Sequence, residues 1–345
     1  MKSQTNPAPP QPTLFPTTEL DIQATVLIVT YNSEDHIEAC LDALERAANR
    51  HRLKVVILDN RSKDRTVERI HRSFPALQVL QTGANLGFAA ANNLGREYAV
   101  GHYLFLLNPD TRVQPDAFEK AIAWMDAHPD CGLCGGQLLD DLGNVHPSAR
   151  RFPNLWNKMA VLSGLAEKFP HFPLFKGVEY RKCDSTEPLE VDWVPGAFTG
   201  IRSKMLEEIG FFDERFFLYY EETDLCRRSS AAGWKIVYLP SVKVYHEGGG
   251  CSKTVGDERF DSAGSQILKF RLRSECLYHR KHLGWIGVAA HLGFEWLWHQ
   301  IRRRIHFRDN PGASEKRRYS AMLCNQIARA LEDTRWGSSC PAKPW

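Results

Sequence analysis

The feature that most constrains the fold is an alternation of short apolar runs with amphipathic stretches between Ala24 and Leu139. Four mainly apolar runs have strand length, and strands buried on both faces of a sheet read this way. They are residues 25–30, 53–58, 77–80 and 102–107. Helical periodicity fills the intervals, for example over residues 34–48. Strands that alternate with helices predict an α/β fold, with a mostly parallel sheet and flanking helices.

Composition excludes several classes of protein. The chain has 345 residues, of which 43% are hydrophobic and 25% charged, as in globular proteins. Its formal net charge of +3 is too balanced to indicate a nucleic acid as the main partner. The cysteines are scattered except for Cys131 and Cys134, which lack a second pair at zinc spacing. We therefore expect a buried strand at this pair, no disulfide framework, and a reducing cytoplasmic location.

The two ends of the chain predict different kinds of structure. Residues 1–22 are rich in proline and have no apolar signal segment, so we expect a flexible leader. Residues 256–310 predict C-terminal helices, and residues 311–345 a polar tail. The run 283–307 combines aromatic residues with Arg302–Arg304. It fits either a helix on an anionic membrane surface or a helix whose aromatic side chains pack on the body.

Polar side chains follow each of the four apolar runs. In open α/β sheets, ligands bind outside the carboxyl ends of the strands. We therefore predict one ligand site along this edge of the sheet. Its candidate residues are Thr30, Tyr31, Asn32, Asp59, Asn85, Gly87, Asn108 and Asp110.

Seven motifs in a fixed order resemble family 2 glycosyltransferases of the GT-A fold, within the rhamnosyltransferase-like branch that builds bacterial surface polysaccharides. They are VTYNS (29–33), LDNRSKD (58–64), NLGFAAANN (85–93), LNPDT (107–111), GAFTGIRS (196–203), YYEETDLCRRSSAAGW (219–234) and YHEGGG (245–250). The resemblance implies a Rossmann-like GT-A domain over 23–255, with a nucleotide-binding half (23–140), an acceptor half (141–255) and a helical C-terminal extension. It also implies an inverting enzyme that uses a nucleotide-diphospho-sugar and usually a divalent cation.

On this resemblance, the strand-end residues bind the donor. Asp59 would accept the imide N–H of uracil or thymine, and Tyr31 would stack on the base. The alternatives are that Asp59 stabilises its own turn and that Tyr31 packs at the strand end. Asn85 and Gly87 open a helix whose N-terminus would approach the diphosphate. The alternative for this loop is close packing of helix on sheet.

Asp110 and His246 are the candidate metal ligands. A leaving diphosphate gathers negative charge, which bound Mg²⁺ or Mn²⁺ offsets. Many relatives carry Asp-x-Asp where this chain has Asn108-Pro109-Asp110, so one carboxylate is missing. Neutral imidazole suits Mn²⁺ better than Mg²⁺. The alternatives are that Asp110 caps the helix that begins near Pro115 and that His246 is structural.

Glu222 is the candidate general base. Relatives carry Glu-Asp at positions 221 and 222, and the second acid usually removes the acceptor proton. The flanking aromatic residues would raise its pKa by desolvation. Trp193, Gly196 and Glu221 match the acceptor side, where an indole stacks on a sugar face. The alternatives are an acidic first turn of a helix and a core tryptophan.

Together these features predict an inverting hexosyltransferase at the inner face of the cell membrane. It would move a sugar from dTDP-L-rhamnose or a UDP-sugar to a hydroxyl of a glycan or lipid-linked oligosaccharide. A sugar nucleotidyltransferase would instead need a glycine-rich basic loop where Thr30–Ser33 stand. A non-catalytic nucleotide-sugar-binding protein would not need Asp59, Asp110 and Glu222. The sugar, the acceptor, the linkage and the oligomeric state are not predicted.

Overall fold

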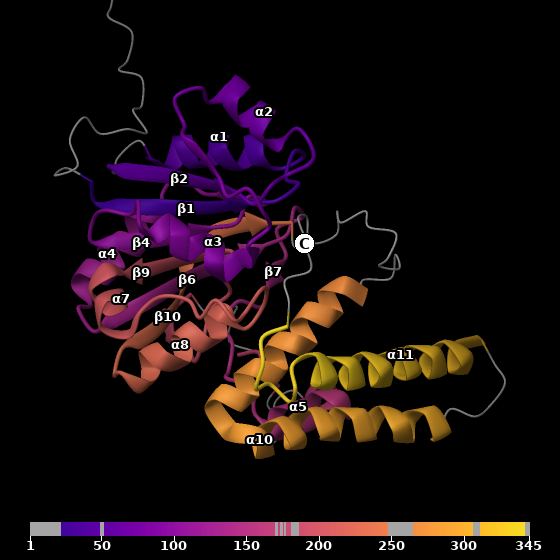
Figure 1. Cartoon of the computed structure of the whole chain (residues 1–345). Helices are drawn as coiled ribbons and strands as arrows, with labels where there is room; N and C mark the ends of the chain where they lie inside the picture. The colour runs from indigo at the N-terminus through magenta and orange to yellow at the C-terminus, as the bar shows by residue number, and fades with distance from the viewer. Residues whose placement is uncertain are drawn as a thin grey trace, which may run out of the picture.

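A ten-stranded sheet forms the centre of the computed structural model, and a helical extension lies beside it (Figure 1). The structure describes residues 22–48, 52–169, 172, 175, 177–180, 186–247, 265–305 and 311–341. The expected flexible leader therefore falls outside the described residues except for Ile22.

The sheet is mostly parallel, as the alternating pattern predicts. Its strand order is β3-β2-β1-β4-β9-β6-β10-β5, with β7 paired to β6 and β8 to β10. β9 runs antiparallel between β4 and β6, and β5 runs antiparallel to β10. The bounds are β1 Ala24–Thr30, β2 Leu53–Asp59, β3 Val79–Gln81, β4 Tyr103–Leu107, β5 Thr111–Val113, β6 Cys131–Leu139, β7 Val145–His146, β8 Leu189–Glu190, β9 Phe198–Arg202 and β10 Lys235–His246. The buried strand expected at Cys131 and Cys134 is β6.

Helices cover both faces of the sheet. They are α1 Ile37–Ala48, α2 Thr66–Ser73, α3 Gly87–Arg96, α4 Ala117–Ala127, α5 Leu155–Leu162, α6 Leu165–Lys168, α7 Ser203–Ile209, α8 Glu221–Ala231, α10 Ser265–Ile305 and α11 Pro311–Asp333. Successive strand residues point to opposite faces. Val26 and Ile28 pack in one core with Phe118 of α4, whereas Leu27 packs in the other with Leu225 of α8. This two-sided burial explains the continuous apolar runs in the sequence.

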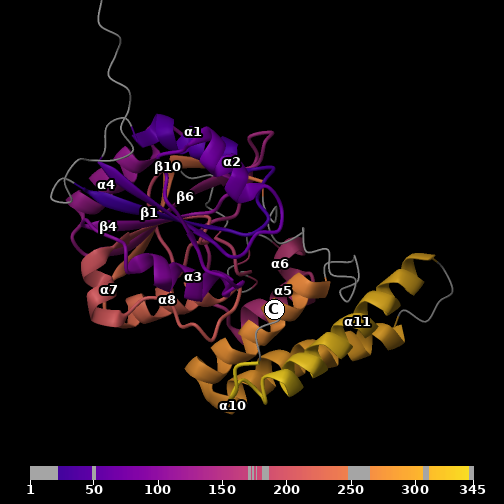
Figure 2. The same cartoon turned by 45° about the horizontal axis from the view of Figure 1, so that its top comes forward.

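The helical extension consists of α10 and α11, which lie side by side in both views (Figures 1 and 2). α10 bends at Gly284, whose φ of 70° is not helical. The polar tail expected over 311–345 is wrong for α11. Ile327 and Ala330 of this helix pack on Leu272 and Leu292 of α10. A few small and apolar side chains at helical spacing bury one face of an otherwise polar segment, and such a narrow stripe is easily missed in a sequence.

Asp224 of α8 fixes the extension to the body. Its carboxylate accepts hydrogen bonds from Lys281 Nζ at 2.9 Å and His282 Nε2 at 2.8 Å, both from α10. Arg228 Nε of α8 donates to the same group at 2.9 Å. In addition, Ser274 Oγ of α10 donates to the backbone carbonyl of Leu218 at 2.8 Å. Among the helices that the structure describes, none combines the length and the apolar character needed to cross a membrane.

Candidate active site

Asp59 ends β2 and lies at the centre of a buried hydrogen-bonded turn. Thr30 Oγ1 donates to its Oδ1 at 3.0 Å, and the hydroxyl and backbone N–H of Ser62 donate at 2.5 and 2.9 Å. The turn-stabilising alternative therefore describes part of its role. A carboxylate can accept about four hydrogen bonds, so these three leave capacity for one further donor.

Tyr31 and Asn32 follow β1 at the same edge of the sheet. Burial raises the pKa of the Tyr31 phenol, although a hydrogen bond with Asn85 acts to lower it. Asn32 and Arg61 adopt left-handed backbone conformations, with φ of 48° and 62°. Side-chain to backbone bonds hold this turn, including one from Lys63 N to Asn32 Oδ1 at 2.8 Å. Such conformations cost about 1–2 kcal/mol each and concentrate at functional sites.

The start of α3 packs closely against the chain near Phe217. Asn85 Oδ1 accepts the backbone N–H of Gly87 at 3.0 Å, and Phe88 N donates to the Phe217 carbonyl at 2.8 Å. Gly87 has a φ of 82°, and a Cβ atom there would lie 2.3 Å from the Phe217 oxygen. The first N–H groups of α3 are therefore bonded within the chain. This contact agrees with the close-packing alternative for Gly87, and the Asn85 side chain is hydrogen-bonded to Tyr31.

Asp110 and His246 lie next to each other, although they are 136 positions apart in the sequence. β5 pairs with β10 so that His246 stands opposite Thr111. His246 Nε2 consequently lies 3.4 Å from Asp110 Oδ1. The helix-cap alternative for Asp110 is wrong, because α4 begins at Ala117. Asn108 supports this loop: its carbonyl accepts the Thr111 hydroxyl at 2.6 Å.

Glu221 and Glu222 begin α8 directly after two strained residues. Tyr219 and Tyr220 have φ of 69° and 70°, so two consecutive side-chain-bearing residues are left-handed. The Oε2 atoms of both glutamates are buried and have no hydrogen-bond partner among the described residues. Burial raises the pKa of Glu222, although the charge of Arg150 and a backbone hydrogen bond from Gly196 act to lower it. Burial, and then the neighbouring Glu222, raise the pKa of Glu221 well above its ordinary value.

A cavity of about 330 Å³ opens beside Glu222. The body contributes Arg150, Trp193 and Glu222 to its lining, and α10 contributes Arg271 and Glu275. Trp193 is largely buried, as the core alternative expects, and its indole donates to a backbone carbonyl at 2.9 Å. One ring face nevertheless carries the Arg150 guanidinium at 5.0 Å. The helical extension therefore completes the wall of the cavity that Glu222 faces.

Backbone contacts connect Glu222 with the Asn108–Asp110 loop. Gly196, which bonds Glu222, is followed by Ala197, whose carbonyl accepts Asn108 N at 3.0 Å. A Cβ atom on Gly196 would lie 3.3 Å from Phe88 at the start of α3. Gly196 therefore lies between the predicted donor and acceptor sides.

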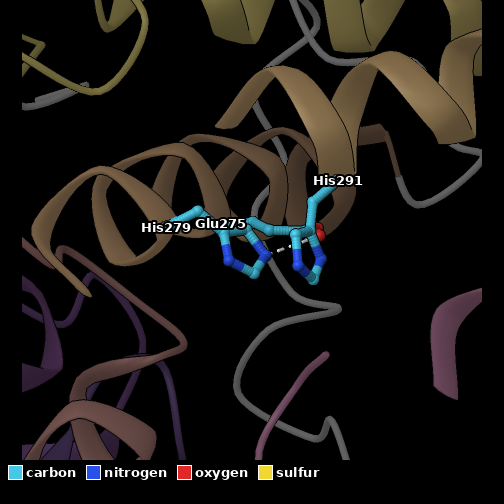
Figure 3. A group of neighbouring side chains, drawn as sticks. All are labelled: Glu275, His279 and His291. Carbon is cyan, nitrogen blue, oxygen red and sulfur yellow. Dashed lines mark ion pairs between the residues drawn. The ribbon is translucent and has the colours of Figure 1, made fainter. Parts of the chain in front are cut away.

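A buried charged cluster in the wall of the cavity is absent from the sequence-based predictions. Lys158 Nζ of α5 lies 2.7 Å from Glu275 and 2.5 Å from Glu295 of α10. Figure 3 shows Glu275 with His279 and His291, three side chains whose ligand-type atoms lie within 4.8 Å of one another. Burial would raise the pKa of Glu275, but Lys158 and His279 hold it well below its ordinary value. The Lys158 ammonium and the nearby Arg271 guanidinium supply the two positive charges that the two buried carboxylates require, so the cluster is balanced without an ion.

Burial also acts on the two imidazoles of this cluster. It lowers the pKa of His279, and it lowers the pKa of His291 to about 3. Both rings are therefore neutral at pH 7 and stack with centroids 3.7 Å apart. The only local signal in the sequence is the spacing of Glu275 and His279 by four residues on one helix.

The sheet and the covering helices define a GT-A glycosyltransferase fold. The solved structure of GalNAc-T7 with UDP, GalNAc and Mn²⁺ is similar at a TM-score of 0.50 and 14% identity, over 94% of this chain and 59% of that one. The family model for glycosyl transferase family 2 matches residues 25–210, more than half of the chain. The chain belongs to glycosyl transferase family 2.

Two similar relatives are bacterial rhamnosyltransferases. The N-acetylglucosaminyl-diphospho-decaprenol L-rhamnosyltransferase of Mycobacterium tuberculosis is 33% identical over 235 residues, which cover 64% of this chain and 75% of the relative. The rhamnosyltransferase WbbL of Escherichia coli K12 is 26% identical over 64% of this chain and 82% of its own length. The protein is thus a glycosyltransferase, and the nucleotidyltransferase and non-catalytic alternatives are wrong.

Proposed function

We propose that this glycosyltransferase moves L-rhamnose from dTDP-L-rhamnose to a hydroxyl of a sugar that is linked through diphosphate to a lipid. The observation that carries the proposal is the cavity beside Glu222, because it offers a buried carboxyl oxygen without a partner next to an indole and two guanidinium groups. The names of the two rhamnosyltransferase relatives support the sugar, and that of the M. tuberculosis relative supports the acceptor class. A UDP-sugar is the alternative donor.

Glu222 acts as the general base in this proposal. The acceptor hydroxyl gives its proton to the Glu222 carboxylate while its oxygen forms a bond with the anomeric carbon. The bond between that carbon and the diphosphate oxygen breaks, and the nucleoside diphosphate departs with the electron pair. Attack opposite the leaving group inverts the anomeric configuration. Because burial raises the pKa of Glu222, the group holds the proton more firmly than an exposed glutamate does.

The donor and acceptor occupy different sides of the site. Asp59, with one acceptor position left, binds the base of the nucleotide in the half formed by residues 23–140. Trp193 and Arg150 contact the acceptor in the half formed by residues 141–255. Glu221 is buried beside Glu222 at the start of α8, on the acceptor side.

Asp110 and His246 would hold a divalent cation. Their facing oxygen and nitrogen atoms suit Mn²⁺, and an ion with few protein ligands takes further oxygens from a bound diphosphate. When bound, the cation supplies Lewis-acid stabilisation of the leaving diphosphate. A chelator should abolish transfer, Mn²⁺ should restore it better than Mg²⁺, and Asp110→Ala should weaken Mn²⁺-dependent binding of the donor. Full activity in chelator would refute this part.

The extension carries the contact with an anionic membrane at the inner face of the cell membrane. Leu283, Trp285 and Ile286 near the bend in α10 are exposed, at 42%, 62% and 63%. Arg302–Arg304 end the same helix and would meet lipid phosphates. The double variant Trp285→Ser, Ile286→Ser should sediment less with phosphatidylglycerol vesicles than the unchanged chain. Equal sedimentation would favour the alternative, in which these aromatics serve packing alone.

Glu222→Gln tests the function directly. The substitution removes the base but keeps the size of the side chain, so donor binding should stay within about twofold while kcat falls by about 10²- to 10⁴-fold. Glu207→Gln is the matched control, because Glu207 is exposed on α7. Radiolabelled transfer from dTDP-L-rhamnose, UDP-glucose and UDP-N-acetylglucosamine measures both the donor and the rate. Unchanged turnover in Glu222→Gln would remove Glu222 as the base.

A further inference from the structure

A second groove, lined mostly by apolar residues, lies between α5 and the C-terminal part of α10. It has a volume of about 470 Å³. Val161 and Leu162 of α5 form one wall, and Trp298, Ile301 and Ile305 of α10 form the other. We propose that this groove binds the first isoprene units of the acceptor's lipid chain. The inference rests on the proposed function and identifies the part of the chain that recognises the lipid.

The groove lies next to the cavity beside Glu222, because Val161 and Leu162 at the end of α5 line both of them. A ligand that extends from one into the other has a polar end beside Glu222 and an apolar end beside Ile301. This division matches a sugar joined to a hydrocarbon chain.

Guanidinium groups lie where the linker between sugar and lipid would pass. Arg150, Lys158 and Arg271 are the lysine and arginine side chains that line the cavity. Lys158 is held between Glu275 and Glu295 and is therefore compensated. Arg150 and Arg271 line the same cavity, and a guanidinium binds phosphate oxygens through paired hydrogen bonds. A diphosphate between sugar and lipid fits this order of groups.

The walls of the groove leave apolar surface in contact with water. Val161 is 51% exposed, Ile301 42% and Ile305 64%. Exposed apolar side chains that gather around a groove mark a binding surface, because covering them is favourable in proportion to the area removed from water. Arg302 at the rim adds a positive charge that suits an anionic membrane surface from which a lipid enters. A peptide helix would fill the groove but would not explain why it lies next to a polar cavity.

Photo-crosslinking tests the groove without requiring turnover. The probe is farnesyl diphosphate that carries a benzophenone on its hydrocarbon end, added to the full-length protein in buffer without membranes. Labelled peptides should contain residues 161–164 or 298–305, and unlabelled farnesyl diphosphate should compete. Ile301→Glu should reduce labelling about tenfold, because it sets a charge against the hydrocarbon. Leu297→Glu is the matched control: Leu297 is 51% exposed on the same helix but does not line the groove.

Each outcome of this experiment decides the inference. Retained labelling in Leu297→Glu together with loss in Ile301→Glu supports the groove, provided that both variants melt within 2 °C of the unchanged chain (on the order of 1 kcal/mol). Equal loss in the two variants would show general adsorption to an apolar surface and would overturn it. Labels outside the two segments would overturn it as well. If Ile301→Glu unfolds, the milder Ile301→Ser replaces it with the same expected direction.

Kinetics separate this inference from the proposed function. The acceptors are N-acetylglucosaminyl-diphospho-decaprenol and an analogue in which a five-carbon alcohol replaces the decaprenol. Ile301→Glu should raise KM about tenfold for the long acceptor and less than twofold for the short one. If Ile301→Glu changed KM by the same factor for both acceptors, the result would refute the lipid-binding groove but not the proposed transferase activity. Absence of transfer by the unchanged chain to either acceptor would refute the proposed function, whatever the crosslinking shows.

Discussion

Removing the charge of Asp224 should loosen the attachment of the helical extension. The side chain is fully buried and accepts from Arg228, Lys281 and His282. Breaking a buried ion pair by removing one partner costs about 3–5 kcal/mol. We expect the lower end for Asp224→Asn, about 3 kcal/mol, because Lys281 also contacts Asp213 at 2.8 Å and Arg228 also donates to backbone carbonyls. For 345 residues this corresponds to a fall in Tm of about 4 °C.

Differential scanning calorimetry at several pH values checks both the size and the cause of this effect. Burial would raise the pKa of Asp224, but the hydrogen bonds from His282, Lys281 and Arg228 lower it below 3.8. The stabilisation is therefore present in full well above pH 3.8 and is lost as the pH falls through the lowered pKa. The gap in Tm between the two proteins should be present at pH 7 and should close in acid. A gap below 1 °C at pH 7 would refute the reasoning.

The control for this prediction is Asp130→Asn. Asp130 also forms an ion pair, with Lys235 at 2.7 Å, but about half of each side chain is exposed. Exposed pairs contribute little to stability, so the Tm of this variant should equal that of the unchanged chain. A comparable loss at Asp130 would show that carboxylate charge in general, rather than the buried attachment, stabilises the fold.

Three further predictions concern the site and its surroundings. Burial raises the pKa of Glu221 in the folded protein, so folding becomes less favourable as the pH rises above 4.5. Glu221→Gln removes this cost and should raise Tm at pH 8. Melting curves should show the rise in Tm shrinking as the pH falls toward 4.5. Lys158→Met removes the ammonium that lies between Glu275 and Glu295 and should lower the unfolding free energy by about 3–5 kcal/mol, measured by urea denaturation. Gly87→Ala forces a Cβ to 2.3 Å from a backbone oxygen at a φ of 82° and should cost about 2–3 kcal/mol by the same assay, with weaker donor binding by calorimetry.

The sequence predicts the sheet and its carboxyl edge well, because both depend on local patterns. Buried parallel strands are continuously apolar, and each one ends at the same edge. Position at that edge also brings Asp110 near His246, since β10 pairs with β5. The helix-cap alternative for Asp110 failed for a simple reason: Asp116, closer to the helix, occupies the N-cap position.

The extension resists prediction because tertiary contacts determine it. Lys158 and Glu275 are 117 residues apart, and no periodicity in either segment indicates that they meet. In the sequence alone, each of these residues is typical of a charged side chain on the exposed face of a helix. The same limit applies to Asp224, which resembles an acidic residue in the first turn of a helix until Lys281 and His282 approach it from α10.

Helix α8 joins the proposed base to the attachment of the extension. Glu222 and Asp224 lie two residues apart on its first turn, directly after the strained Tyr219 and Tyr220. A strained turn persists only when its surroundings hold it, and the bonds that α10 makes to Asp224 are part of those surroundings. The extension thus stabilises the turn that orients the base, in addition to forming a wall of the cavity. For this reason, a change in its docking should alter kcat as well as acceptor KM, whereas a separate lipid-binding module would alter KM alone.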